Sequence, residues 1–159
     1  MKMRFFVFLV FGLLLAGCSI KEYKNNESKI IVIRSPQLKY ADLGYIRSNG
    51  DALRIELYEM GHLVKSIEIN NLICVDDTCL LKSMFNEKYL NTHYPTELLQ
   101  DVILGKTIYE GKNLVKTETG FMQNISDENV DIHYEVQNKE IRFKDRRNGI
   151  LLKISSPSP

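Results

Sequence analysis

The sequence lacks an excess of charge of either sign. Its 21 Lys and Arg residues are matched by 20 Asp and Glu residues, and the net charge at pH 7 is +1. A protein that binds nucleic acid through charge carries a basic face for the phosphate backbone. The near balance of charge argues against that class, and we expect no nucleic-acid partner.

Catalytic motifs are lacking as well. The chain contains neither Gly-x-Ser-x-Gly nor His-Glu-x-x-His. The acidic pairs Asp76-Asp77 and Asp127-Glu128 lie in predicted turns, where solvated carboxylates are ordinary. Histidine occurs only at His62, His93 and His133, which is not the spacing of a metal site. We therefore predict no catalytic residue, no metal site and no cofactor.

Long apolar runs are absent except at the N-terminus, where Phe5 to Ala16 is unbroken. Lys2 and Arg4 precede this run, and small residues follow it. A membrane-spanning helix needs about 20 apolar residues, so the run is too short to span. The arrangement is typical of a secretory signal peptide, which we assign to residues 1–17.

The end of this segment, Leu15-Ala16-Gly17-Cys18, resembles the lipobox of bacterial lipoproteins. The resemblance implies that the Cys18 thiol receives a lipid and that the chain is cut before Cys18. Buried acyl carbons contribute about 0.8 kcal/mol each, so two or three chains hold a protein on a bilayer. Ser19, in place of Asp, points to the periplasmic face of the outer membrane. The alternative is an ordinary secretory signal with a chance cysteine.

The two other cysteines, Cys74 and Cys79, enclose a short run of turn-forming residues. Outside the cytoplasm such a pair favours a disulfide. A redox site would more usually be Cys-x-x-Cys, and a metal site would need further ligands nearby. We predict a disulfide, and keep the other two as alternatives.

Short alternating runs separated by turn residues predict a mainly β fold with two helices (α+β). Asn49-Gly50 and Gly61 mark hairpin turns. A helical stripe covers 81–90, and a second helix lies between Thr96 as N-cap and Gly105 at C′. The predicted strands cover 40–47, 53–58, 63–69, 72–75, 114–125, 132–136, 141–144 and 150–154, with an early strand or short helix at 30–33.

These patterns divide the chain into four segments. The signal peptide at 1–17 is followed at 18–35 by the lipidated cysteine, a tether and the early strand. Residues 36–154 form one domain of ordinary size, and 155–159 form a flexible tail.

Two stretches of this domain resemble the LolB family of outer-membrane lipoprotein receptors. They are Arg54-x-x-Leu57-x-x-Met60-Gly61 and the helical segment from Pro95 through Leu98 to Gly105. The resemblance implies an open antiparallel β half-barrel wrapped around short helices. In that family the apolar concavity accepts the acyl chains of lipoproteins from a soluble periplasmic carrier and helps insert them into the outer membrane.

The resemblance also implies roles for particular residues. Met60 and Gly61 would form a protruding tip that enters the membrane, with Met60 folded back on the core as the alternative. The apolar interior is either a ligand cavity or a filled core, and the sequence does not separate the two because both use the same residue types. The residues implied as cavity lining are Leu53, Ile55, Leu57, Ile67, Ile69, Leu98, Val102, Ile132, Tyr134, Ile141 and Phe143.

The expected function is therefore that of a monomeric, membrane-anchored receptor for acyl chains. Its expected partners are the membrane, a periplasmic carrier and acylated proteins. A structural or interaction lipoprotein of the cell envelope, with the same fold and a filled core, is the competing class.

Overall fold

Eleven antiparallel strands form one sheet in the computed structural model, which describes residues 23–157. The predicted mainly β fold is confirmed. The signal peptide, Cys18 and the last two residues of the predicted tail lie outside the described residues. The strands are β1 (Asn25–Arg34), β2 (Lys39–Asn49), β3 (Ala52–Glu59), β4 (His62–Ile69), β5 (Leu72–Val75), β6 (Thr78–Leu81), β7 (Leu114–Thr117), β8 (Gly120–Ser126), β9 (Asp131–Gln137), β10 (Glu140–Asp145) and β11 (Ile150–Ser155).

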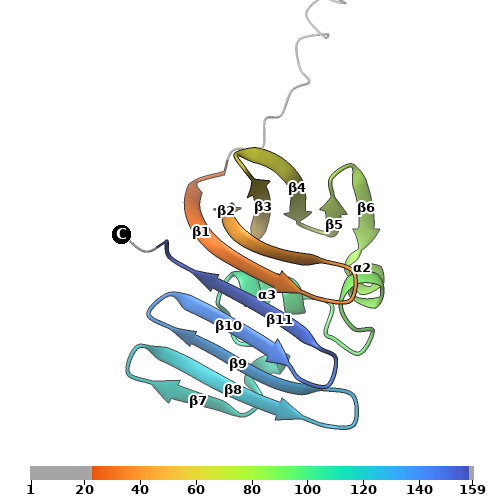
Figure 1. The fold of residues 1–159 in the computed structure, drawn as a ribbon. Coiled ribbons are helices and arrows are strands. Elements are labelled where there is room, and N and C mark those ends of the chain that lie inside the picture. The colour runs from red at the N-terminus through yellow and green to blue at the C-terminus, as the bar shows by residue number, and fades with distance from the viewer. Residues whose placement is uncertain (1–22, 158–159) are drawn as a thin grey trace, which may run out of the picture.

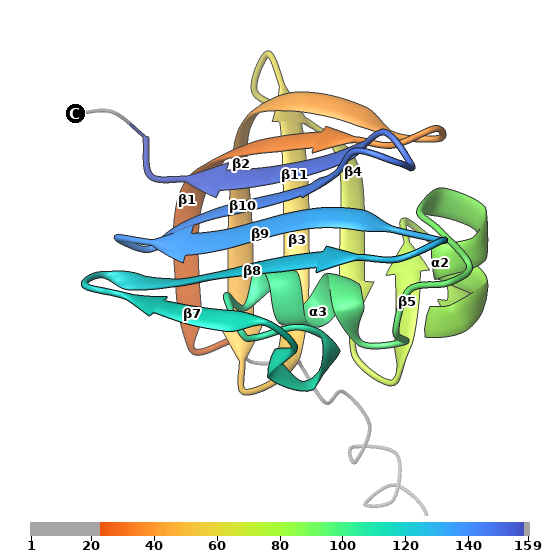
Figure 2. The same ribbon diagram turned by 90° about the horizontal axis from the view of Figure 1, so that it is seen from below.

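The sheet consists of two meanders joined by one pairing of distant strands. The strand order is β6-β5-β4-β3-β2-β1-β11-β10-β9-β8-β7. The chain passes from the first meander to the second through the helices α2 (Lys82–Tyr89) and α3 (Leu98–Ile103) and the short 3₁₀ turn η1 (Tyr109–Gly111). The sheet curves so that the two meanders face each other, and α3 lies in the space between them (Figures 1 and 2).

The first strand begins earlier than the sequence predicts. We expected a polar tether followed by a strand or short helix at 30–33, but β1 starts at Asn25. Its polar half pairs with β2 from Asn25↔Ser48 onward, and its apolar half pairs with both β2 and β11. Backbone hydrogen bonds do not depend on the side chain, so polar residues enter a strand when the neighbouring strand is long. Residues expected to form a tether are therefore part of the sheet.

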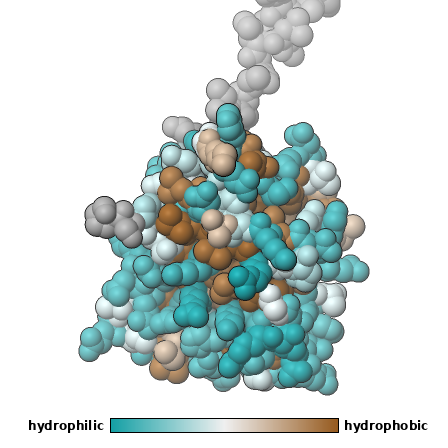
Figure 3. Space-filling view, in the orientation of Figure 1, coloured by the Kyte–Doolittle hydropathy of each residue, from teal (hydrophilic) through white to brown (hydrophobic). Residues whose placement is uncertain are grey.

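Apolar side chains of alternate strand positions fill the space inside the curved sheet. Along β3, for example, Leu53, Ile55 and Leu57 are buried, as the alternation predicts. The outer face is not uniformly polar, since Ile30 and Val32 of β1 are half-buried there. Figure 3 shows hydrophobic surface around β1 and β11 with hydrophilic surface around it.

Tight turns connect most strands of each meander. Met60 and Gly61 both have positive φ between β3 and β4, as do Asn138 and Lys139 between β9 and β10, which is the pattern of a two-residue type I′ turn. The single run predicted at 114–125 is wrong, because it folds into β7 and β8. A side chain on Gly120 would place its Cβ 1.9 Å from the carbonyl oxygen of Val136, so only glycine fits there.

Both predicted helices are present in nearly the predicted places. The N-cap expected at Thr96 is wrong, because α3 begins after Glu97, whose backbone is already helical and makes no side-chain cap. The C-terminal signal at Gly105 is confirmed. Its N–H donates to the Val102 carbonyl, and the N–H of Lys106 donates to that of Asp101, which together form a Schellman motif.

A buried carboxylate organises the turn between β10 and β11. Oδ1 of Asp145 accepts the backbone N–H groups of Asp131, Arg147 and Asn148. Oδ2 accepts the Tyr94 hydroxyl and the Asn148 amide, both at 2.7 Å. Asp145 is fully buried, so these donors replace the water that the charge would otherwise bind. The turn, the start of β9 and the loop before α3 are thereby held together.

Because of three buried or partly buried tyrosines, we predict that the free energy of unfolding decreases at high pH. Burial raises the pKa of Tyr94 and Tyr134, and burial with the nearby charges of Asp127 and Asp145 raises the pKa of Tyr109 to about 12. An unfolded tyrosine ionises near pH 10. The folded state holds these protons more tightly, so stability is complete below about pH 10 and falls as the pH rises above it.

We expect the urea-unfolding free energy, followed by circular dichroism, to decrease from about pH 10 upward. Tyr134→Phe should reduce the slope of that decrease. If all tyrosines ionise near pH 10 while the far-ultraviolet spectrum stays unchanged, the expectation is wrong.

Candidate functional site

An opening between the two meanders, lined by both polar and apolar residues, has a volume of about 350 Å³. We call it the mouth. It lies where the beginning of β1 and the end of β2 face the β9–β10 turn and the C-terminal end of α3. Its apolar lining comes from Ile46, Leu53, Ile103, Leu104, Val136, Ile141 and Ile154, and its other lining residues are Asn25, Glu27, Lys29, Ser48, Gly105 and Lys139.

A much narrower apolar space, the narrow interior, lies next to the mouth. The two share Ile46, Ile103 and Ile154. The free volume of the narrow interior is about 30 Å³, which is roughly the volume of one water in the liquid. Typical ligand pockets occupy about 300–1,000 Å³. The mouth is at the lower end of that range, whereas the narrow interior holds no chain unless side chains move.

The helix α3 fills the concavity. Leu99 and Ile103 lie against the narrow interior, and Ile103 with Leu104 also forms part of the mouth. The helix has only six residues, so its position depends on contacts with the rest of the chain. Because these side chains occupy the centre of the concavity, a shift of α3 would change its free volume.

Polar contacts connect α3 and its flanking residues to α2 and to the β2–β3 turn. The buried Lys82 ammonium of α2 donates to Glu97 and to Gln100 Oε1. The Gln100 amide donates to the backbone carbonyl of Asp51, in the β2–β3 turn, at 3.0 Å. The Lys106 ammonium bonds the Asp51 carboxylate at 2.7 Å, which lowers the pKa of that carboxyl. Side-chain pairs therefore connect both ends of α3 to neighbouring elements.

Two lysines and one carboxylate stand on the polar side of the mouth. Lys29 Nζ lies 2.8 Å from Glu27 Oε2, and the Lys29 side chain is only 13% exposed. The hydrogen bond and charge of Lys29, with a smaller effect of Lys139, lower the pKa of Glu27. Glu27 is thus held ionised, and the three groups together carry one net positive charge.

The residues expected as cavity lining are all buried, but they do not lie together around one cavity. Leu53 and Ile141 line the mouth, and Ile55 and Ile67 line the narrow interior. The remaining residues pack elsewhere in the core. Leu98, Val102 and Phe143 surround a third space of about 10 Å³, while Leu57, Ile69, Ile132 and Tyr134 line none of these spaces.

The β3–β4 tip protrudes into solvent. Met60 is 98% exposed, so it does not fold back on the core. Leu63 and Val64, on the strand that leaves the tip, are also exposed. Gly61 has φ of +80° and open space around its Cα, which suits a sharp turn. Met60, Leu63 and Val64 form an exposed apolar group at one end of the sheet.

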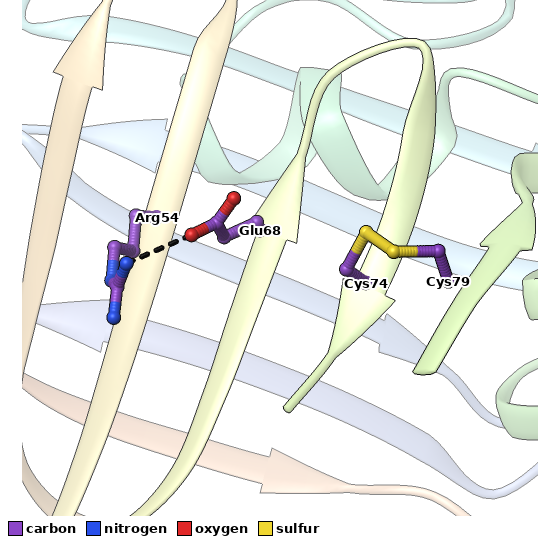
Figure 4. The surroundings of a disulfide bond; sticks show 4 residues. All are labelled: Arg54, Glu68, Cys74 and Cys79. Carbon is purple, nitrogen blue, oxygen red and sulfur yellow. Dashed lines mark hydrogen bonds and ion pairs between the residues drawn. A yellow bond between two sulfur atoms is a disulfide. The ribbon is translucent and has the colours of Figure 1, made fainter. Parts of the chain in front are cut away.

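The predicted disulfide is confirmed. Cys74 and Cys79 are directly opposite each other on β5 and β6, with their Cα atoms 3.9 Å apart. They belong to a row of paired residues that crosses four strands (Figure 4). In this row the Arg54 side chain on β3 donates to the Glu68 carboxylate on β4 at 2.8 Å, and Glu68 lies opposite Cys74. The disulfide thus closes a hairpin at one edge of the sheet, away from the mouth.

Within residues 23–157 no group of three His, Cys, Asp or Glu side chains is arranged to hold a metal ion. Of the histidines, His133 bonds the Asn124 side chain at 2.7 Å on the outer face of β9. No helix in this part of the chain is long and apolar enough to cross a membrane.

Sequence reasoning missed most of the mouth. Lys29 and Lys139 were not singled out, because one begins an apolar run and the other lies in a turn. Ile46, Val136 and Ile154 were assigned to strands but not to a site. Only the pairing of β1 with β11 places these residues at one opening.

Comparison with known proteins finds no matching family model, no matching curated sequence and no matching solved structure, so the resemblance to the LolB family stays a prediction.

Proposed function

We propose that this protein is a membrane-anchored lipoprotein that binds acyl chains at the mouth and helps to insert acylated proteins into the outer membrane. The observation that supports the proposal most directly is that the mouth adjoins an apolar interior, with which it shares three lining residues. An amphiphile could keep its polar end at the rim while its chain lies along the apolar side chains. The curved sheet around α3 would then be the open half-barrel that holds the chain.

A longer chain requires α3 to move. The ion pair between Lys106 and Asp51 is exposed, and such a pair contributes about 1 kcal/mol or less. The Lys82 ammonium is buried, so water would have to replace its contacts with Glu97 and Gln100 if the movement breaks them. The apolar side chains Leu99 and Ile103 would leave the interior as a chain enters, and apolar contact with the chain would replace their contacts. We propose that α3 is displaced in this way when cargo binds.

The β3–β4 tip would make the contact with the bilayer. Asn25 of β1 and Leu53 of β3 both pair with Ser48 of β2, so they lie at the same height in the sheet. Met60 is seven residues beyond Leu53, or about 23 Å along the strand. Cys18 precedes Asn25 by seven residues, which also span about 23 Å when extended. The tip and the anchor can therefore meet one bilayer if β3 and β4 lie along the membrane, or if the anchor segment runs back beside the sheet.

Anchoring is tested by Cys18→Ser. We expect this variant to take up no radiolabelled palmitate and to keep its signal peptide, because the thiol that would carry the lipid is missing. Envelope fractionation and mass spectrometry of the N-terminus measure both results. Cys74→Ser with Cys79→Ser is the matched control and should be labelled normally. Palmitate on the Cys18→Ser protein would show that the lipobox assignment is wrong.

Delivery is tested by Met60→Glu. A carboxylate resists entry into the acyl region of a bilayer, so we expect transfer of an acylated protein into liposomes to fall several-fold. Binding of the cargo should persist, because Met60 is not part of the mouth. Met84→Glu changes another exposed methionine, on α2, and should leave transfer unchanged. Equal transfer by the wild type and Met60→Glu would remove the tip from the mechanism.

The small free volume inside favours a second candidate, a structural or interaction lipoprotein with a filled core. A fluorescent fatty-acid probe separates the two candidates. Ile103→Trp places a larger side chain between the mouth and the narrow interior. Saturable binding of the probe by the wild type, weakened in this variant, supports acyl binding. Absence of saturable binding supports the filled core.

A further inference from the structure

The mouth contains a cation that has no hydrogen-bond or ion-pair partner among residues 23–157. Lys139 lines the mouth, and it forms no hydrogen bond or ion pair with the residues that the structure describes. Its charge acts on Glu27 only at longer range. A lysine at the rim of an apolar opening can keep its ammonium in water while its methylene groups cover apolar surface.

The backbone holds Lys139 in an uncommon conformation. Its φ is +64°, next to Asn138 with φ of +49°, and such values are rare for residues other than glycine. The Asn138 N–H donates to the Thr119 carbonyl at 3.2 Å, which fixes the turn against the neighbouring β7–β8 turn. The ammonium is therefore presented from a well-defined turn rather than from a loose loop.

The opposite side of the mouth carries a paired lysine. Lys29 is bonded to Glu27, which leaves Lys139 as the uncompensated charge of the three. Beneath these groups the lining is apolar, from Leu53, Val136 and Ile141. An occupant that matches this arrangement has one anionic end and one apolar chain.

We infer that the mouth binds a fatty acid, with its carboxylate paired to Lys139 and its chain against the apolar lining. The inference rests on the proposed acyl-binding site and extends its ligands to free fatty acids, because the acyl chains of a lipoprotein are esters or amides and carry no carboxylate. A neutral chain, such as an alcohol, lacks the charge that pairs with Lys139. The structure thus predicts preference for the acid over the alcohol of the same length.

Calorimetric titration with decanoate and with decanol tests this inference, because the two ligands share a chain and differ in charge. The wild type should bind decanoate more tightly than decanol. Lys139→Gln should weaken decanoate binding about three- to tenfold and leave decanol binding unchanged, as expected for loss of one partly exposed ion pair. Lys144→Gln, which removes an exposed lysine from β10, is the control and should change neither.

The outcomes separate the inference from the function on which it rests. If the wild type binds the two ligands equally, or if the two lysine variants weaken decanoate binding equally, Lys139 does not recognise the carboxylate. An apolar site would remain in either case. No binding of either ligand would overturn both this inference and the proposed function.

Discussion

Asp145→Ala should lower the free energy of unfolding by about 3–5 kcal/mol. The substitution leaves three backbone N–H groups, the Tyr94 hydroxyl and the Asn148 amide without their acceptor, and the carboxylate that it removes is fully buried. Each buried donor that loses its partner costs about 1–3 kcal/mol, and local rearrangement recovers part of the total. Urea denaturation followed by circular dichroism measures the loss.

Asp127→Ala is a matched control. Oδ1 of Asp127 also accepts two backbone N–H groups at the start of a turn, but this residue is exposed. Water can replace the lost acceptor, so the expected loss is only about 1 kcal/mol. Similar losses in the two variants would show that the buried carboxylate does not organise the β10–β11 turn.

Gly120→Ala should lower the free energy of unfolding by about 3 kcal/mol or more. The new methyl group would overlap the carbonyl oxygen of Val136 and lie against the Cα of Gln137. Backbone atoms cannot rotate away as a side chain can, so β8 and β9 would have to separate at this end. Loss of the β7–β8 hairpin would be visible as faster amide exchange in β7 and β8.

Gly50→Ala separates steric overlap from backbone strain. Gly50 has φ of +60° with open space around it, so alanine there costs only the unfavourable backbone conformation, about 1 kcal/mol. At Gly120 the cost is steric instead, because its φ is not positive but backbone atoms of β9 occupy the space that a Cβ would need. A smaller effect at Gly120 than at Gly50 would contradict the close approach of β8 and β9.

Features that depend on neighbours in sequence could be predicted. The helix α2 follows from a stripe of apolar residues, and the end of α3 follows from Gly105. The disulfide follows from two cysteines that flank turn residues, because a hairpin places such positions opposite each other. In each case, the residues that determine the structure lie within a few positions of one another.

The start of β1 could not be predicted in this way. Asn25 and the residues after it are polar, and their strand conformation depends on β2, with which they pair. The apolar half of β1 also pairs with β11, as in Ile30↔Ser155. No local pattern contains that pairing.

The candidate site was predicted least well, for a physical reason. A cavity wall and a packed core use the same apolar side chains, so alternation identified buried positions such as Leu57 and Tyr134 without telling which of them border free space. Lys29 and Lys139 belong to different meanders. Only the curvature of the sheet brings them to the same opening.

The pairing of β1 with β11 has a consequence for how the chain folds. Every other strand in the described sheet pairs only with strands next to it in sequence, so each meander can form from local contacts. Pairings between distant segments form slowly, because a long loop must first be ordered. During synthesis β1 is made first and its partner β11 last. Until then one edge of Ile30-Ile31-Val32-Ile33 is unpaired, and a short β-branched apolar run of this kind is prone to aggregate. The chain therefore depends most on protection from aggregation between the appearance of its first strand and that of its last.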